Sequence, residues 1–404
     1  MTLLRLKRVA TIAVSNVDKK SVEGERAVRL CNYTDVYYNE SITSDLPFME
    51  ATATAEQVSR FGLRAGDVLV TKDSETADDI AVPSYVVENM SDVVCGYHLA
   101  VMRSRPGTDG RYLFWALASR DSREQFAASA TGVTRFGLRY EVLGDVLLPS
   151  PPPQEQRAIA KYLDAETARI DALIASKLRL MELAMVRLRS LISSVTENGP
   201  EVRVRHLTSM RTSGPRGWAD RVADFGDAPF IRSANLRRDN IDIREDNLVR
   251  VDPPTTEEAR RSAVRSGDVL VGITGANTGW VGCATDTVAG GFVSQHVAIL
   301  RPSGVESAWL AYSLVAAKAQ DQLLGGQYGG TKQQLGLDDL AELKVHCPRR
   351  GEQQRRVALM AQAHSSSQRL IGCLQRQIDL LAERRQVLIT TTVTGESQLP
   401  EAPS

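Results

Sequence analysis

The sequence predicts an α+β fold in which two tandem, strand-rich domains of mixed α/β type are separated by two long antiparallel coiled-coil helices. Three features predict it. The chain repeats itself with a period of about 198 residues, each repeat opens with short β-type runs, and each repeat closes with a long helical stretch. The repeat implies a pseudo-two-fold relation between the halves. We expect domains over 1–150 and 199–349, a helix over 151–198, and a second helix with a tail over 350–404.

The internal repeat is carried by matching segments that follow one another in the same order in both halves. Residues 66–70, with the sequence Gly-Asp-Val-Leu-Val, recur unchanged as residues 267–271. Looser matches continue along each half: 98–103 with 296–301, 112–117 with 309–314, 145–149 with 343–348, and Gln156-Arg157 with Gln354-Arg355. One architecture is therefore expected twice in the chain.

The first part of each half is predicted to be a strand-rich globule. Runs of apolar, often β-branched residues such as 68–71 and 269–273 are separated by Gly, Pro, Asn and Asp. Such runs are typical of short strands, and the residues between them are typical of turns.

Two stretches without proline, 154–196 and 352–392, predict long helices. Their apolar residues recur at spacings of three and four, as in a heptad seam that needs a partner. The predicted seam comprises Leu163, Ile170, Ile174, Met181, Leu188 and Leu191 in the first helix, and Ile371, Leu374, Ile378, Leu381 and Leu388 in the second. Each seam has one charged position, Lys177 and Arg385.

Length and connectivity predict that the two helices cover each other. About 43 residues at ~1.5 Å per residue extend about 60 Å, more than the diameter of one domain of about 150 residues. The first helix ends where the second domain begins, so a helix that starts after the second domain must run back along it. The alternative is that each helix packs only on its own domain.

Charge is balanced over the whole chain but not along it. The chain has 49 Lys+Arg and 49 Asp+Glu, and a net charge of zero weakens the case for nonspecific binding to nucleic acid. Basic residues nevertheless gather where each half begins, with eight arginines and three aspartates in 203–238 and seven basic against three acidic residues in 5–29. One such run is usually a solvated face, whereas two at matching positions favour a binding surface.

The cysteines and the hydropathy pattern exclude several classes of protein. Five cysteines without a C-x-x-C pair fit a reducing cytoplasm and predict neither a disulfide framework nor a zinc site. Cys95 and His98 have the spacing of metal ligands but lack a second pair, so we expect no metal site. No apolar run is long enough to span a membrane.

Further motifs give the chain a family resemblance. They are the paired Gly-Asp-Val-Leu-Val runs, the segment 30–36, and Leu147-Leu148-Pro149 leading through Pro151-Pro152-Pro153-Gln154-Glu155-Gln156-Arg157 into the first helix. With these motifs the chain resembles the specificity subunit of type I restriction-modification systems over essentially its whole length. Two departures stand out: the second helix start, 348–355, lacks the proline run, and His364-Ser365-Ser366-Ser367 interrupts the second seam.

The resemblance implies a bacterial or archaeal cytoplasmic protein without catalysis of its own. Each domain would be a target recognition domain that reads one part of a bipartite, asymmetric site in double-stranded DNA. The helices would dock two methyltransferase subunits, and restriction subunits with motor and nuclease activity would complete the complex. S-adenosylmethionine, ATP and Mg²⁺ are then expected on the partner subunits, with no cofactor on this chain.

Two pairs of loops are the candidate DNA-reading surfaces. Shortly after each Gly-Asp-Val-Leu-Val run, the chain carries Lys72 and Ser74 in the first half, and Thr274 and Asn277 in the second. A second surface holds Thr134 and Arg135, with Thr331 and Lys332 as counterparts. Cations suit guanine or phosphate, Asn suits adenine, and hydroxyls suit either. The alternative for the glycine-containing second surface is a tight turn. Unlike loops on equal scaffolds predict unlike half-sites.

No motif predicts chemistry in the chain itself. Asp252-Pro253-Pro254 lacks the aromatic of a base-holding methyltransferase motif and instead predicts a turn into a helix starting near Thr255 or Thr256. The glycine-rich run 272–279 lacks the Gly-Lys-Ser/Thr ending of a phosphate loop, and Asp339 with Glu342 is a poor metal cradle. Two alternatives remain: a noncatalytic helical scaffold that binds protein rather than DNA, and, disfavoured by the missing motifs, an autonomous nuclease or methyltransferase.

Overall fold

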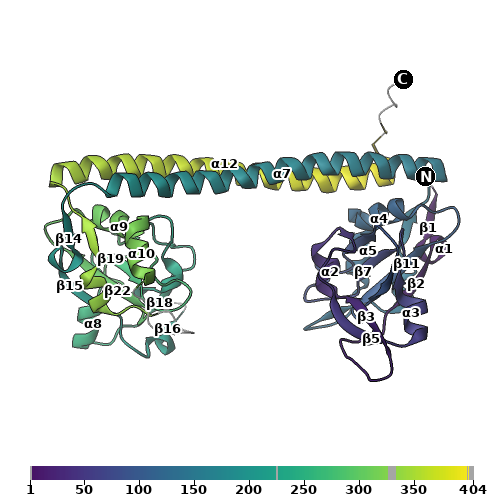
Figure 1. Ribbon diagram of the computed structural model, residues 1–404, viewed down its shortest axis with the longest axis horizontal. Helices are drawn as coiled ribbons and strands as arrows, with labels where there is room; N and C mark the ends of the chain where they lie inside the picture. The colour runs from purple at the N-terminus through teal and green to yellow at the C-terminus, as the bar shows by residue number, and fades with distance from the viewer. Residues whose placement is uncertain (1, 224–225, 326–333, 398, 400–404) are drawn as a thin grey trace. The chain divides into compact units, whose positions relative to one another are not determined.

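A computed structural model describes residues 2–223, 226–325, 334–397 and 399 (Figure 1). The chain divides into two compact units. Unit 1 consists of residues 1–176 and 377–404, and unit 2 consists of residues 177–376. Each unit therefore combines a globular part with a portion of each long helix.

Unit 1 has a strand-rich globular part. Its strands are β1 (Leu3–Arg5), β2 (Ala10–Val14), β3 (Arg26–Cys31), β4 (Ser41–Ile42), β5 (Met49–Ala53), β6 (Gly62–Leu63), β7 (Val68–Thr71), β8 (Asp73–Ser74), β9 (Pro83–Val86), β10 (Met90–Cys95), β11 (Leu99–Ser104), β12 (Phe136–Gly137) and β13 (Leu147–Pro149). Its short helices are α1 (Leu6–Val9), α2 (Tyr33–Tyr38), α3 (Ala55–Phe61), α4 (Gly110–Ala118), α5 (Arg120–Ser129) and α6 (Tyr140–Leu143).

Two sheets form the body of unit 1. One has the strand order β2-β11-β7-β9-β4 and the other the order β5-β3-β10-β6. Most neighbours are antiparallel, and β10 runs parallel to β3. Buried side chains from β7 and β11 contribute to two cores, one shared with α4 and the long helices and one between the sheets. In Figure 1, α4 lies on the side of the sheet that faces the long helices.

Unit 2 repeats this plan, with fewer strands among its described residues. Its strands are β14 (Glu201–Arg203), β15 (Thr208–Ser213), β16 (Val222–Ala223), β17 (Ala228–Ile231), β18 (Val249–Val251), β19 (Val269–Gly272), β20 (Val281–Cys283), β21 (Phe292–Val293), β22 (Val297–Pro302) and β23 (Lys344–His346). Its short helices are α8 (Glu257–Ser262), α9 (Ser307–Val315), α10 (Ala317–Gly325) and α11 (Leu337–Glu342).

The strand order confirms the internal repeat. In unit 1, β11 lies between β2 and β7, and in unit 2, β22 lies between β15 and β19. The strand pair β1-β13 has its counterpart in β14-β23, and the parallel pair β3-β10 has its counterpart in β17-β21. The predicted fold class, two mixed α/β domains with long helices, is confirmed.

The repeated Gly-Asp-Val-Leu-Val run is explained by a buried ion pair. The carboxylate of Asp67 accepts two hydrogen bonds from Arg103, both of 2.8 Å, and Asp268 accepts two from Arg301, of 2.8 and 2.7 Å. Both aspartates are 1% exposed. The glycine before each aspartate has a positive φ, of 88° at Gly66 and 83° at Gly267, a conformation that favours glycine. The motif thus encodes a turn and a buried anchor.

The two halves fill one equivalent position with different aromatic residues. Near the start of α4 the hydroxyl of Tyr112 donates to the carbonyl of Pro149 at 2.8 Å. Near the start of α9 the indole N–H of Trp309 donates to the carbonyl of His346 at 2.9 Å. Both aromatic residues tie a buried helix to the last strand before a long helix. The scaffold is retained although the side chains differ.

The two long helices are α7 (Pro153–Thr196) and α12 (Arg350–Thr394), of 44 and 45 residues. They run antiparallel within each unit. In unit 1, Ile159 and Leu163 share a core with Ile389 and Val393. In unit 2, Ile192 shares a core with Met360, and the guanidinium of Arg356 donates to the carbonyl of Val195 at 3.0 Å. No helix among the described residues combines the length and hydrophobicity needed to cross a membrane.

The predicted seam residues all lose solvent exposure. Leu163, Ile170, Leu188 and Leu374 are buried, whereas Ile174, Met181, Leu191, Ile371, Ile378, Leu381 and Leu388 are half-buried. The charged seam position Arg385 pairs with Asp171 on α7 at 3.1 Å and with Glu40. At the interruption of the second seam, His364 is buried beside Asp242, with 3.3 Å between Nε2 and Oδ2. Polar seam positions are therefore used to tie each globular part to its helices.

A glutamine locks the start of each long helix. Gln156 accepts a hydrogen bond from the amide of Asp109 at 2.8 Å and donates to the carbonyl of Pro151 at 2.8 Å. Its structural counterpart is Gln353, which accepts from the amide of Glu306 at 2.9 Å and donates to the carbonyl of Pro348 at 2.7 Å. The predicted match of Gln156 with Gln354 is wrong by one residue. Gln354 is exposed, because a helix shifted by one residue turns its side chains by about 100°.

Replacing Gln156 with alanine is expected to lower the free energy of unfolding by about 2–3 kcal/mol, because a buried amide and a buried carbonyl lose their partners. The side chain is 2% exposed, so water cannot easily replace it. Urea unfolding followed by circular dichroism measures the change. The neighbouring Gln154 is exposed, and its replacement by alanine is the matched control. Equal stability of the two variants would contradict the role of Gln156.

Candidate nucleic-acid interface

The structure brings the two predicted surfaces of unit 1 together. After β7 the chain continues into β8, which pairs antiparallel with β12, so Ser74 faces Phe136. The amide of Leu138 also donates to the carbonyl of Lys72 at 2.9 Å. The loop after the central strand and the loop over 131–135 therefore form one site, although about 60 residues separate them in the sequence.

Unit 2 builds the same junction with other residues. Thr274 forms an isolated antiparallel bridge with Gln334, and the amide of Leu335 donates to the carbonyl of Ile273 at 2.9 Å. The turn that follows is compact: Gly275 and Gly279 have positive φ values of 85° and 82°. Thr274 and Asn277 are half-buried in it. The predicted residues Thr331 and Lys332 lie outside the described residues.

A cavity of about 550 Å³ opens at the junction in unit 1. Three of the predicted DNA-binding residues, Ser74, Thr134 and Arg135, line it. The remaining lining residues are Tyr33, Tyr37, Tyr38, Asp73, Glu75, Thr76 and Asp79. We call this cavity the unit 1 cleft. It combines aromatic rings, hydroxyls, carboxylates and one guanidinium.

The tyrosines of the cleft come from α2. The rings of Tyr33 and Tyr37 stack with centroids 5.4 Å apart and an interplanar angle of 16°. Asn32 and Asp35 form a capping box at the first turn of this helix, and so help to fix the positions of its tyrosines. These tyrosines were missed as site residues in the sequence. The segment 30–36 carried the family resemblance, but nothing in the sequence places it beside 73–76 or 134–135.

A hydrogen bond fixes the hydroxyl of Tyr37, and burial shields that of Tyr33. Tyr37 donates to the carboxylate of Asp79 at 2.5 Å, and this bond raises the pKa of Tyr37 to about 12. Burial raises the pKa of Tyr33 above its usual range. Both phenols therefore stay protonated at neutral pH, and the Asp79 carboxylate remains an acceptor at the cleft wall.

The predicted residues differ in how available they are. The ammonium of Lys72 lies 3.3 Å from the carboxylate of Asp73 and 4.9 Å from the ring centroid of Tyr97. Asp73 also accepts from Nδ1 of His98 at 2.7 Å. Lys72 is thus held inside a local network, and Ser74 is buried. Thr134 and Arg135 are exposed, and among the described residues no hydrogen bond or ion pair engages the Arg135 guanidinium.

The acidic residues of unit 2 that were considered for metal binding have structural partners. Glu342 pairs with Arg203 at 3.1 Å and also with Arg205, and Asp339 accepts from the amide of Gly336 at 2.7 Å. Within the described parts of the chain no group of three or more His, Cys, Asp or Glu residues is arranged to hold a metal ion. The Asp-Pro-Pro run leads into α8, which Thr256 caps by accepting from Ala259 at 3.2 Å, as predicted.

The helices of unit 2 carry an apolar groove of about 520 Å³. Leu180, Leu183, Ala184, Leu188 and Leu191 line it from α7, and Ala363 and Leu370 from α12. Arg187, Ser366 and Ser367 complete its walls. The serines interrupt the second seam, and because they are small they leave the space between the helices unfilled. We call this feature the unit 2 groove.

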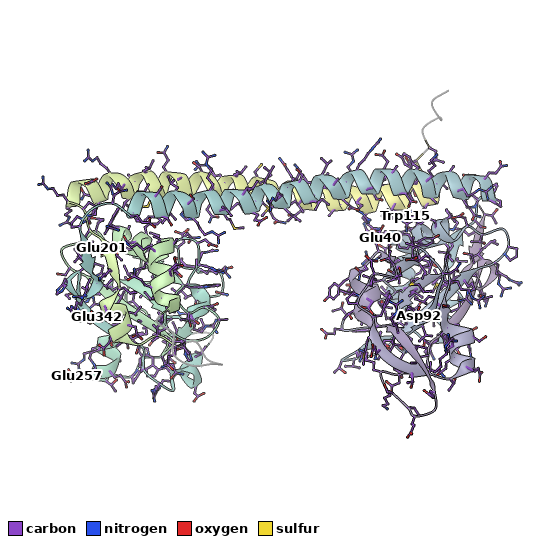
Figure 2. All side chains as sticks on the ribbon, in the orientation of Figure 1. Glu40, Asp92, Trp115, Glu201, Glu257 and Glu342 are labelled. Atoms are coloured by element: carbon purple, nitrogen blue, oxygen red, sulfur yellow. The ribbon has the colours of Figure 1, made fainter. Side chains whose placement is uncertain are left out.

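A network of hydrogen bonds and ion pairs ties the globular part of unit 1 to the long helices. In unit 1, Trp115 donates from its indole N–H to Asp164 on α7 at 2.8 Å, and Arg111 pairs with the same carboxylate at 2.8 Å. Figure 2 shows Trp115 and Glu40 on the side of unit 1 next to the long helices. Glu40 lies two residues after the end of α2, so the helix that supplies the cleft tyrosines is connected to α12 through Arg385.

Comparison with known proteins gives structural matches only. No protein-family model and no curated protein sequence matches the chain. One solved structure is described as the structural basis of complex assembly and conformational transition of the type I R-M system. One of its chains matches this chain with a TM-score of 0.73 and 18% identity, over 97% of both chains. The HsdS subunit from Thermoanaerobacter tengcongensis matches with a TM-score of 0.52 and 18% identity, over 98% of this chain and 97% of that one. The chain has the fold of type I specificity subunits.

Proposed function

We propose that this chain, with the fold of a type I restriction-modification specificity subunit, binds double-stranded DNA at a bipartite, asymmetric site. The observation that carries the proposal is the junction built twice on one scaffold. Asp73 and Ser74 pair with 136–137 in unit 1, and Thr274 pairs with Gln334 in unit 2. Equal scaffolds with unlike loops suit two modules that read unlike base sequences.

The cleft chemistry supports base reading in unit 1. Carboxylates accept from the amino group of cytosine, arginine donates to guanine, and hydroxyls serve either base. Asp79, Thr134 and Arg135 offer these groups in one cavity. Because Asp73, Glu75 and Asp79 surround a single free guanidinium, the cleft disfavours phosphate and favours base edges.

The helices are proposed to dock the two methyltransferase subunits. The unit 2 groove is apolar and lies on a helix pair, and such a groove accepts an apolar helix face of a partner. Leucines at its rim, Leu180, Leu183 and Leu370, are about half exposed in this chain alone. Large exposed apolar patches on a soluble chain mark interaction surfaces.

The chemistry is then assigned to the partners. Methyl transfer, with S-adenosylmethionine, belongs to the methyltransferase subunits, and ATP and Mg²⁺ belong to the restriction subunits with their motor and nuclease. This chain is proposed to recognise the DNA site and to provide the helices on which the complex assembles, and it takes no catalytic step.

Co-expression of the chain with a type I methyltransferase subunit that binds it is expected to methylate adenines in one split, nonpalindromic motif. Sequencing of the methylated genome identifies the motif, and the same strain without this chain is the control. The absence of any split motif, with the complex formed, would contradict DNA reading. A complex that assembles but binds no duplex would favour the alternative, a noncatalytic helical scaffold that binds protein.

A further inference from the structure

We propose that Val133, at the tip of the loop over 131–135, contacts the 5-methyl group of one thymine in the half-site read by unit 1. The inference rests on the proposed function and adds to it the identity of one base. It follows from the shape of the loop, the exposure of its tip and the charge around it.

The loop, which we call the finger, is a short hairpin closed by one bridge between Thr131 and Gly137. Thr131 and Gly137 exchange two backbone hydrogen bonds, the amide of Thr131 donating at 3.1 Å and the amide of Gly137 at 2.9 Å. The base of the finger is held on β8 through its pairing with β12. At Gly132 the backbone is so tight that a Cβ atom would lie 1.9 Å from the carbonyl oxygen of Arg135. The DNA major groove admits a two-stranded β-ribbon, and we expect it to admit this short hairpin as well.

The tip of the finger presents an apolar side chain to solvent. Val133 is 94% exposed, the highest value among the large hydrophobic side chains of the described residues. The hydrophobic effect disfavours such exposure, so the side chain gains free energy when an apolar group covers it. Val133 therefore adds no burial to the core and is available to contact an apolar group of a ligand.

The neighbours of Val133 determine which ligand group it meets. Thr134 and Arg135 line the unit 1 cleft beside Asp79 and Glu75. A phosphate at this place meets carboxylates, whereas the base edges of the major groove offer amino groups to the carboxylates and acceptors to Arg135. In that groove the thymine methyl is the apolar group of the standard bases. The apolar tip of a polar finger therefore matches thymine.

The test uses the full chain in complex with its methyltransferase and duplexes that carry the mapped motif. Each thymine is replaced in turn by deoxyuridine, which lacks only the methyl group. For the unaltered chain, one replacement is expected to lower kcat/KM for methylation about fourfold, the factor for one buried methyl-sized group. For Val133→Ala the same replacement is expected to have almost no effect.

Controls separate this inference from the proposed function. Val133→Ser lacks both γ-methyl groups and is expected to lose the same thymine effect, while Val87→Ala, at a site in unit 1 that is 48% exposed, is expected to retain it. If every thymine replacement in the half-site read by unit 1 has equal effects in Val133→Ala and in the unaltered chain, the inference is overturned while DNA reading stands. Absence of methylation at any split motif by the assembled complex overturns the proposed function itself.

Discussion

Replacing Asp268 with alanine is expected to lower the free energy of unfolding by about 3–5 kcal/mol, because it leaves a partly buried guanidinium without its counter-charge. The Arg301 side chain is 17% exposed and makes both of its short bonds to this carboxylate. Asp268 also accepts from the amide of Arg265 at 2.8 Å and so holds the turn before β19. Urea unfolding gives the change, and hydrogen exchange of β19 and β22 locates it in unit 2.

Two comparisons sharpen this prediction. Glu342→Ala removes an exposed partner of Arg203 and Arg205 and is expected to cost at most about 1 kcal/mol. Replacing Asp268 with leucine and Arg301 with methionine together is expected to restore most of the lost stability, since apolar pairs can substitute for buried ion pairs. A small effect of Asp268→Ala would mean that water reaches and solvates Arg301.

Placing glutamates in the unit 2 groove, by Leu183→Glu with Leu370→Glu, is expected to weaken binding of the methyltransferase partner by about 30-fold to 1000-fold. The expected loss equals about 2–4 kcal/mol, the range for central residues of an interface. Leu183 is 47% exposed, so the change should spare the helix pair itself. Calorimetric titration of the chain with the purified partner measures the loss.

Met185→Glu is the matched control for the groove. Met185 lies on the same helix, but a step of two residues turns it about 200° from Leu183, and it does not line the groove. Its replacement is expected to leave binding within about twofold. Circular dichroism checks that all variants keep their helices. Unchanged affinity in the groove variant would place the partner on another surface and leave the assignment of the fold intact.

Patterns that repeat locally were sufficient to predict the architecture. Helical spacing over about 40 residues without proline predicts α7 and α12, and the structure places their starts at Pro153 and Arg350. The Gly-Asp-Val-Leu-Val runs predict two equivalent strands, which are β7 and β19. Each of these features depends on residues that lie close together in the sequence, so the sequence alone predicts it.

Long-range contacts could not be predicted in this way. The equivalence of Gln156 with Gln353 depends on which carbonyl each side chain reaches, whereas the sequence comparison paired Gln156 with Gln354. The cleft tyrosines of α2 lie in one cavity with residues 73–76 and 134–135. No periodicity in the sequence predicts this contact. Lys72, expected to be available, is held by Asp73 beside Tyr97, because the fold gives it partners that its own segment does not reveal.

The sequence by itself determined the duplication, the two long helices and the family resemblance, because each is written in residue spacing along the chain. Only the tertiary structure decided which side chains share a cavity. It joined the loop after β7 to the finger over 131–135, surrounded Arg135 with acceptors and left Val133 at an exposed tip. A binding site depends on distances across the sheet, and those distances arise only when strands remote in sequence pair.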